Sequence, residues 1–266
     1  MQQQPNDLLI TLIQTSLHWE DPAANRQMFS KHFDSIKEET HVIVLPEMFS
    51  TGFTMNAKTV AEKMDGQTVL WMTQEAKRKK CVITGSLLIE EAGNYFNRLF
   101  WMNPDGDFLT YDKRHLFRLS GEEKVFTAGN KKIIVELNGW KICPLVCYDL
   151  RFPVWSRRTA EADYDVLIYA ANWPQKRIYA WNQLLPARAI ENQSYVIGVN
   201  RWGNDGNNAE HPGCSAAIDF KGEKLNRNES GEFIETVSLS FEALQQFRNH
   251  FAFHRDADTF RLENGE

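Results

Sequence analysis

The chain has 266 residues, of which 42% are hydrophobic and 12% aromatic, and its formal net charge at pH 7 is −5. This composition is typical of a folded globular protein, and the length suffices for one large α/β domain with a substantial core. The net negative charge argues against broad electrostatic binding to nucleic acid or to an anionic membrane surface.

The sequence predicts neither a signal peptide nor a membrane-spanning helix. No basic segment precedes a hydrophobic run at the N-terminus, so we expect no signal peptide. No apolar run approaches the ~20 residues that a membrane-spanning helix needs. The four cysteines are too few and too scattered for a disulfide framework. We therefore expect a cytoplasmic protein with reduced thiols.

Apolar runs and amphipathic stretches alternate in the first third of the chain. Residues 8–17 are largely apolar and predict a buried strand. Asp21 is placed to cap a helix over residues 22–37. A short, dense apolar run at 42–45 predicts a second strand, and helical spacing returns over 68–79.

The middle of the chain has the pattern of β-structure. Alternation and apolar runs predict five strands, over residues 82–89, 95–102, 108–113, 132–137 and 140–146. Asn103-Pro104-Asp105-Gly106 predicts a tight turn between the second and third of these strands. Asn138-Gly139, the strongest short-range turn signal in the chain, predicts a hairpin between the last two.

The last part of the chain again mixes both element types. A short helix is expected after Pro153, and further strands are predicted over residues 165–171, 195–200, 215–220 and 233–239. Helices are predicted over 177–192 and 241–247, and residues 203–208 predict a loop. Pro186 should kink the first of these helices or mark a restart. The last dozen residues have the character of a tail or arm.

Helices and strands are interleaved along the whole chain, and no linker or internal repeat stands out. This pattern indicates an α/β fold, with the strands forming two sheets and the helices covering their outer faces. We therefore expect a single domain over residues 1–266.

Cys147 ends the apolar run 142–146, at the point where a buried strand gives way to polar residues. Reacting groups in layered α/β proteins often collect at such strand ends. A thiol there can act as a nucleophile if another group takes its proton. A lone cysteine in an apolar stretch is more often an inert core residue, because free cysteine packs as a small hydrophobic side chain. Its interpretation therefore depends on partners elsewhere in the chain.

Two further strand ends carry groups that suit a cysteine amidase. Glu47 closes the run that starts at Val42, and Lys113 closes the strand that starts at Phe108. Taken singly, each is compatible with a solvent-exposed side chain. Their coincidence with Cys147 favours one cleft that receives all three groups.

Five stretches, in this order along the chain, carry a family pattern: Leu45-Pro46-Glu47-Met48-Phe49, Tyr111-Asp112-Lys113-Arg114-His115-Leu116-Phe117, Val146-Cys147-Tyr148-Asp149-Leu150-Arg151-Phe152-Pro153, Arg188-Ala189-Ile190-Glu191-Asn192-Gln193 and Gly198-Val199-Asn200-Arg201. With them the chain resembles the nitrilase, or carbon–nitrogen hydrolase, superfamily over most of its length. The resemblance implies a four-layer αββα sandwich of two mixed β-sheets flanked by helices. It also implies a catalytic triad of Glu47, Lys113 and Cys147, and a homodimer.

The resemblance further implies a second glutamate, a few residues before a Pro-Gly pair. Spacing back from Gly129 favours Glu122, but Glu123 is adjacent, and Ala128 stands where the family has proline. Both glutamates therefore remain candidates. Pro186 is a second departure, because the family's helix commonly continues through that position.

A mechanism follows from these groups. Glu47 would accept the proton of Cys147, later protonate the departing ammonia and then activate water. The Lys113 ammonium and the backbone N–H of Tyr148 would stabilise the oxyanion of the tetrahedral intermediate. A thioester would form on Cys147 and be released as the acid. This chemistry needs no cofactor or metal, and the seven histidines show no metal-ligand spacing.

Within the superfamily, the stretch after Cys147 and the segment Ala171-Asn172-Trp173-Pro174 are most similar to the omega-amidase branch. Such enzymes hydrolyse the terminal amide of 2-oxo dicarboxylic acid monoamides, such as 2-oxoglutaramate, to 2-oxoglutarate and ammonia. A substrate of this kind has a carboxylate at its far end, so cations or donors should line the pocket. The candidate cations for this carboxylate are Arg151, Lys176, Arg177 and Arg201. Asn172 is a further candidate substrate contact, and Phe117 and Trp173 are expected to form walls of the pocket.

Three alternatives remain open from the sequence. Another small-amide or carbamoyl hydrolase of the same superfamily would share the triad and differ in the pocket. A papain-like hydrolase would use His115 or His211 as its base and leave Glu47 and Lys113 without a role. A catalytically dead binding scaffold would release no ammonia.

Overall fold

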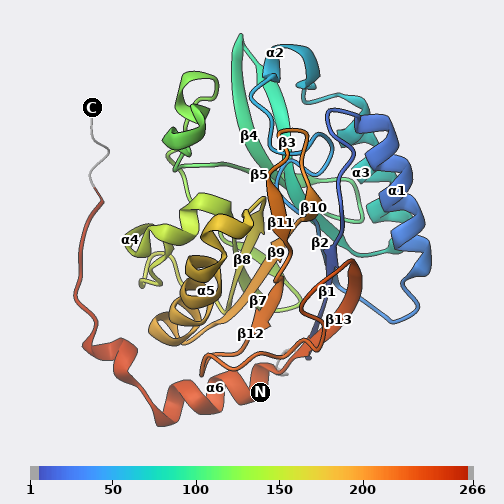
Figure 1. The fold of residues 1–266 in the computed structure, drawn as a ribbon. Coiled ribbons are helices and arrows are strands. Elements are labelled where there is room, and N and C mark those ends of the chain that lie inside the picture. The colour runs from blue at the N-terminus through green and yellow to red at the C-terminus, as the bar shows by residue number, and fades with distance from the viewer. Residues whose placement is uncertain (1–5, 263–266) are drawn as a thin grey trace.

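The computed structural model describes residues 6–262 of the chain and shows two β-sheets packed face to face (Figure 1). Helices cover the outer face of each sheet, which gives the order helix, sheet, sheet, helix (Figure 1). The expected αββα architecture is therefore confirmed.

The first sheet has six strands in the order β13-β1-β2-β3-β4-β5. Their bounds are β1 Leu8–Gln14, β2 Val42–Val44, β3 Val82–Glu91, β4 Asn94–Met102, β5 Phe108–Asp112 and β13 Phe233–Leu239. The strands β1, β2 and β3 are parallel neighbours, whereas β13, β4 and β5 pair antiparallel to their neighbours. The sheet is therefore mixed.

The second sheet has five strands in the order β12-β9-β8-β7-β6. Their bounds are β6 Val135–Leu137, β7 Trp140–Val146, β8 Val166–Ala171, β9 Tyr195–Asn200 and β12 Ala216–Ile218. Its central strands β7, β8 and β9 are parallel, and both edge strands pair antiparallel. A separate small hairpin is formed by β10 (Trp202–Asn204) and β11 (Glu210–Pro212).

The main core lies between the two sheets. Alternate residues of a strand point to opposite faces, so each buried strand feeds two cores. In β8, Val166 and Ile168 belong to the cluster between the sheets, whereas Leu167 and Tyr169 pack toward the helices. A strand buried on both faces has a continuous run of apolar residues, and this pattern allowed such strands to be predicted from the sequence.

Two outer layers complete the fold. Helix α1 (Pro22–Ser35) and helix α3 (Gln67–Lys79) cover the first sheet, and helix α5 (Ile178–Asn192) packs on the second. The helix α5 continues through Pro186 and does not restart there, contrary to one of the two expected outcomes. Its buried face, which includes Trp181, is packed against β9, so tertiary contacts hold the helix where proline removes one hydrogen bond.

Some elements were not predicted or end elsewhere. The first strand stops at Gln14 and not at residue 17, and the predicted loop 203–208 is mostly the tip of the β10–β11 hairpin. The remaining short elements are the helices α2 (Ala57–Val60) and α4 (Pro153–Ser156) and the 3-10 helices η1 (Arg118–Ser120), η2 (Glu122–Lys124), η3 (Cys147–Arg151), η4 (Gln175–Arg177) and η5 (Phe253–Asp256).

The C-terminal helix α6 (Phe241–His250) is followed by an arm that leaves the body of the protein (Figure 1). The last four residues of the predicted tail lie outside the described residues. Within residues 6–262, none of the helices combines the length and the apolar character needed to cross a membrane.

Candidate active site

The strand topology brings three of the predicted residues to one place. Because β2 and β3 are parallel and β3, β4 and β5 alternate in direction, β5 runs parallel to β2. The carboxyl ends of β2 and β5 therefore meet at the same edge of the first sheet. Glu47 follows β2 and Lys113 follows β5, while Cys147 follows β7 of the facing sheet.

Lys113 and two glutamates form a buried charge cluster. The Lys113 Nζ lies 2.8 Å from Glu47 Oε1 and 2.9 Å from Glu122 Oε2. Both glutamates are fully buried and Lys113 is 1% exposed. Burial alone would lower the pKa of Lys113, but the carboxylates of Glu122 and Glu47 outweigh it and raise the pKa. Lys113 is therefore a permanent cation.

Glu122 is the glutamate that reaches Lys113, whereas Glu123 lines a separate small hollow beside His115. The Glu122 carboxylate also accepts the backbone N–H of Phe117 at 2.5 Å. Burial raises the pKa of Glu122, Lys113 lowers it, and the neighbouring Glu47 raises it further.

Asn97 in β4 joins the cluster, although no feature of the sequence predicts this role. Its Nδ2 donates to Glu47 Oε1 at 2.8 Å and to Glu122 Oε1 at 3.2 Å. Asn172 holds Glu47 from the opposite sheet, since its backbone N–H donates to Glu47 Oε2 at 3.0 Å and its side chain donates to the Glu47 carbonyl. The Glu47 carboxylate is thus fixed by donors from both sheets.

Cys147 begins the 3-10 helix η3 with a backbone φ of 42°. This value lies in the left-handed region, which residues other than glycine rarely adopt. Asp149 holds this bend. Its carboxylate accepts hydrogen bonds from the Val146 N–H at 3.1 Å, the Tyr111 hydroxyl at 2.7 Å and the His115 N–H at 3.1 Å. A fully buried carboxylate thus anchors the strand end that presents the thiol.

The Cys147 thiol is 8% exposed and lies within the field of the charge cluster. Burial raises its pKa well above the ordinary value, the Glu47 carboxylate raises it further, and Lys113 acts in the opposite direction. The positive charge of Lys113 is already shared by two carboxylates. The thiol is therefore protonated at neutral pH, and it could act as a nucleophile only if a base removed its proton.

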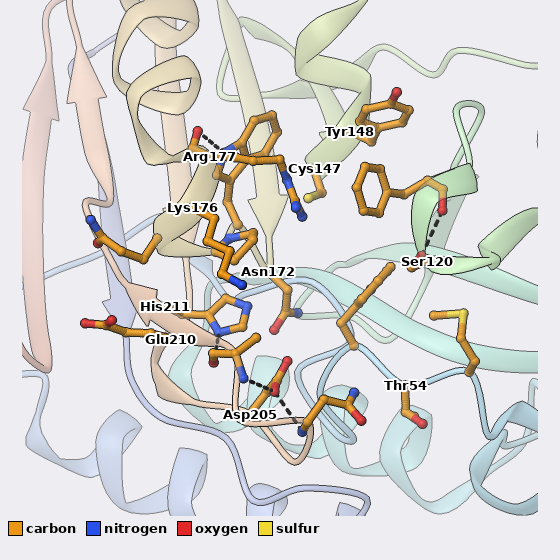
Figure 2. Close-up of a pocket in the computed structure, with 18 of the residues that line it drawn as sticks. Thr54, Ser120, Cys147, Tyr148, Asn172, Lys176, Arg177, Asp205, Glu210 and His211 are labelled. Carbon is orange, nitrogen blue, oxygen red and sulfur yellow. Dashed lines mark hydrogen bonds between the residues drawn. The ribbon is translucent and has the colours of Figure 1, made fainter.

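A cavity of about 940 Å³ opens over the thiol (Figure 2). Its lining includes Lys113, Cys147 and Tyr148. Six of the seven residues predicted to line the substrate pocket also belong to it, namely Phe117, Arg151, Asn172, Trp173, Lys176 and Arg177. In Figure 2 the Arg177 side chain reaches toward Cys147, whereas Asp205 and Glu210 lie on the far side of the pocket.

Two guanidinium groups on the cavity wall rest on aromatic rings. The Arg177 Cζ lies 4.6 Å from the centre of the Phe117 ring, and the Arg151 Cζ lies 4.9 Å from that of Trp173. Partial burial and, to a lesser degree, Arg151 lower the pKa of Arg177. Within residues 6–262, neither Arg151 nor Arg177 forms an ion pair with a carboxylate.

The structure does not bring Arg201 into the cavity lining, so the expectation that it contacts substrate is corrected. Its side chain is fully buried and donates to the carbonyl of Asn204 at 2.9 Å. Because its backbone lies between β9 and β10, the guanidinium supports the hairpin that rims the cavity. Burial lowers the pKa of Arg201 to about 10.

The two histidines of the papain-like alternative have other partners. His115 Nδ1 lies 2.8 Å from Asp149 Oδ1, and its ring stacks on Phe152 at 3.6 Å. His211 lines the cavity, but its Nδ1 lies 3.0 Å from the Ala209 carbonyl, and burial lowers its pKa to about 4. Neither arrangement couples a histidine to the thiol.

The chain matches known proteins over nearly its full length. Residues 9–249 match the family model described as carbon–nitrogen hydrolase. The chain is 44% identical over 256 residues to the omega-amidase YafV of Escherichia coli (strain K12), covering 96% of this chain and 98% of that protein. It is 30% identical over 242 residues to the 2-oxoglutaramate amidase of Bacillus subtilis, covering 90% and 93%.

A solved structure agrees with the same family. The protein XC1258 of Xanthomonas campestris, described as a CN-hydrolase superfamily protein with an arsenic adduct in its active site, superposes with a TM-score of 0.94 at 42% identity. The match covers 97% of this chain and 99% of that one. Sequence pattern, fold and relatives agree, and the chain belongs to the carbon–nitrogen hydrolase family as an amide-hydrolysing enzyme.

Proposed function

We propose that this enzyme hydrolyses the terminal amide of small 2-oxo dicarboxylic acid monoamides, with 2-oxoglutaramate as the representative substrate. Cys147 is the nucleophile, Glu47 the base and Lys113 the stabiliser of the oxyanion. Glu122 holds Lys113 in place. The names of the two sequence relatives described above agree with this substrate class.

The first half-reaction starts from a protonated thiol. Cys147 attacks the amide carbonyl carbon while Glu47 takes its proton, and the carbonyl oxygen becomes an oxyanion. The Lys113 ammonium and the Tyr148 N–H stabilise this oxyanion. Tyr148 lies in the first turn of η3, where backbone N–H groups have no partner within the helix. Glu47 then gives the proton to the departing amine, the carbon–nitrogen bond breaks, and ammonia leaves a thioester on Cys147.

The second half-reaction returns the enzyme to its starting state. Water attacks the thioester carbon while Glu47 accepts one of its protons, and the same donors stabilise the second oxyanion. The carbon–sulfur bond breaks, the sulfur regains the proton from Glu47, and the acid is released. One carboxyl group thus acts as base and acid in turn, which requires that it stay within reach of sulfur, nitrogen and water.

The pair of guanidiniums on the cavity wall is the observation that carries the substrate assignment. Arg151 and Arg177 lie beside Cys147, repel each other and have no carboxylate partner within the described chain. A substrate carboxylate at the far end of a short amide would supply the missing anion, and guanidinium groups bind carboxylates in a bidentate manner. Neutral amides lack that group. Phe117 and Trp173 hold the two cations and form walls of the pocket.

Two further expectations belong to this proposal. The enzyme forms a homodimer, as resemblance to the family implies, and it acts in the cytoplasm, where its thiols stay reduced. All four cysteines are free in the structure.

A panel of amides tests the proposal. Ammonia release is measured with 2-oxoglutaramate, glutamine, N-carbamoyl amino acids and butanamide, and Cys147→Ala serves as the control. We expect the highest kcat/KM with 2-oxoglutaramate and no release by the variant, which should remain folded by circular dichroism. A higher kcat/KM with an N-carbamoyl compound would assign the enzyme to the carbamoyl hydrolases. Failure to release ammonia from any amide would contradict an amidase.

A further inference from the structure

Asn97 contacts every charged member of the cluster around Lys113, yet it carries no charge and does not line the cavity. It is fully buried in β4. Its side-chain amide bridges the carboxylates of Glu47 and Glu122, and its backbone carbonyl accepts the Lys113 N–H at 3.0 Å. The last contact belongs to the main chain and survives any substitution of the side chain.

The bridge fixes how Glu47 presents its oxygens. A carboxylate oxygen accepts about two hydrogen bonds. Both positions on Glu47 Oε1 are filled, by Lys113 at 2.8 Å and by Asn97 at 2.8 Å. Its Oε2 accepts the Asn172 N–H at 3.0 Å and keeps one position for a further donor. We assign that position to the Cys147 thiol, whose pKa is raised by burial and by the nearby Glu47 carboxylate.

The orientation of the Asn97 amide shows which of its atoms matters. Its Oδ1 is buried and has no hydrogen-bond partner within the described residues. An unpaired buried acceptor is unfavourable. The opposite orientation would turn this oxygen toward two carboxylates and would be worse. The Asn97 side chain therefore acts through its NH₂ group, as a donor to the two glutamates, and is not part of a fully satisfied structural network.

We propose that Asn97 is a positioning residue of the amidase: its NH₂ group clamps the Glu47 and Glu122 carboxylates beside Lys113 and turns the free position of Glu47 toward the nucleophile. The inference rests on the proposed role of Glu47 as the base. It adds a residue that acts through Glu47 and does not touch the substrate.

The test compares two variants of Asn97 in the full-length enzyme. Asn97→Ala removes the donor, and Asn97→Asp keeps the shape but replaces the donor with a third acidic group. Rates of ammonia release from 2-oxoglutaramate are measured across pH. The matched control is Asn226→Ala, because Asn226 is also buried but its NH₂ group contacts only the backbone carbonyls of Ser215 and Asn228.

For Asn97→Ala we expect kcat to fall roughly tenfold to a hundredfold, with KM nearly unchanged. The acidic limb of the pH profile should move upward by about one pH unit, because Glu122, whose pKa is already raised by burial, accepts a proton more readily when it loses the Asn97 donor. Asn97→Asp should be slower than Asn97→Ala at neutral pH, since like charges crowd the cluster. Asn226→Ala should lower the Tm and leave the pH profile in place.

A packing role for Asn97 makes the opposite predictions. The isosteric Asn97→Asp would then be milder than Asn97→Ala, and neither would move the pH profile. Loss of the folded state in both variants would also overturn the positioning role in favour of a structural one. Glu47→Gln, measured in parallel, separates the two proposals: an active Glu47→Gln refutes the base itself, whereas an inactive Glu47→Gln with unchanged Asn97 variants refutes only this inference.

Discussion

At the scale of single residues, the state of the Cys147 thiol decides how the chemistry begins. The thiol is held beside one lysine and two glutamates, so the local charge does not favour a thiolate. In the proposed mechanism the enzyme therefore differs from cysteine hydrolases that store a thiolate–imidazolium pair, because its thiol would ionise only as it attacks.

This state predicts the pH dependence of alkylation. Because the pKa of Cys147 is raised, its thiolate form is present only at alkaline pH. Labelling of the Cys147 peptide by iodoacetamide, followed by mass spectrometry, should therefore be slower at pH 7 than labelling of glutathione. The rate should keep rising above the pH of about 8.5 at which an ordinary thiol is half ionised. A rate that levels off below pH 7 would show a stored thiolate instead.

Arg151 and Arg177 should set the preference for a charged substrate. Replacing either one with alanine removes a charged donor, so the KM for 2-oxoglutaramate should rise roughly tenfold to a hundredfold. The kcat/KM for butanamide should change less than about threefold, because that amide has no carboxylate to bind. Arg227→Ala, which removes an exposed arginine outside this cavity, is the matched control. Equal losses on both substrates would show that the arginines support the fold and not the specificity.

The sequence predicted the charged members of the site better than their neutral and structural partners. Glu47, Lys113 and Cys147 stand at abrupt changes from apolar to polar sequence, which any strand end displays. Asn97 lies inside β4, where no change from apolar to polar sequence marks a strand end, and its contact with Glu47 forms only when the chain folds. The anchoring role of Asp149 could not be predicted either, because its contacts with Tyr111 and His115 form only when the chain folds. Arg201 was misjudged because the sequence does not reveal whether a guanidinium faces a cavity or a buried turn.

At the scale of elements, the packing of α5 on β9 supports the sheet that carries Cys147. Gly198 in β9 allows the close approach, because a Cβ at this position would lie 2.7 Å from Trp181 Cζ2 and 2.8 Å from Leu185 Cδ1. Gly198→Ala should therefore lower the free energy of unfolding by about 1–3 kcal/mol, measured by urea denaturation. Gly93→Ala serves for comparison. Gly93 has a positive φ but no atom within 4 Å of the added Cβ, so this variant measures a backbone cost without a close contact. No loss of stability in Gly198→Ala would mean that α5 shifts freely.

Element prediction succeeded where burial makes the pattern strong. The strands of the two sheets and the amphipathic helices α1 and α3 were predicted to within about three residues of their observed ends. The β10–β11 hairpin was missed, because its short strands carry no alternation and its tip is polar. The helix α5 passes Pro186 because packing on the sheet outweighs the local cost of proline, and a local rule does not include that packing.

At the scale of the whole molecule, the layered fold follows from two features of the sequence, continuous apolar strands and helices with one apolar face. How the two sheets face each other does not follow from either feature, and the resemblance to a family supplied it. The meeting of Glu47, Lys113 and Cys147 depends on that arrangement, since the cysteine comes from a different sheet.

The proposed homodimer gives a prediction at this scale. One chain has a mass of 30.8 kDa, so sedimentation equilibrium should give twice 30.8 kDa, about 62 kDa, at micromolar concentration. Several large apolar side chains on α4 and α5 are exposed in the single chain, namely Val154, Tyr179 and Ile190. Such exposure favours burial against a second copy. A mass of one chain across the concentration range would contradict the dimer.

The most direct test of the central claim is the rate of ammonia release from 2-oxoglutaramate by Glu47→Gln. Glutamine keeps the shape of the side chain but does not accept the thiol proton, and Lys113 retains Glu122 as its counterion. We predict that kcat falls at least about a hundredfold while the variant stays folded. A kcat within about tenfold of the wild-type value would contradict the account, because the proton of Cys147 would then leave by a route that does not involve Glu47.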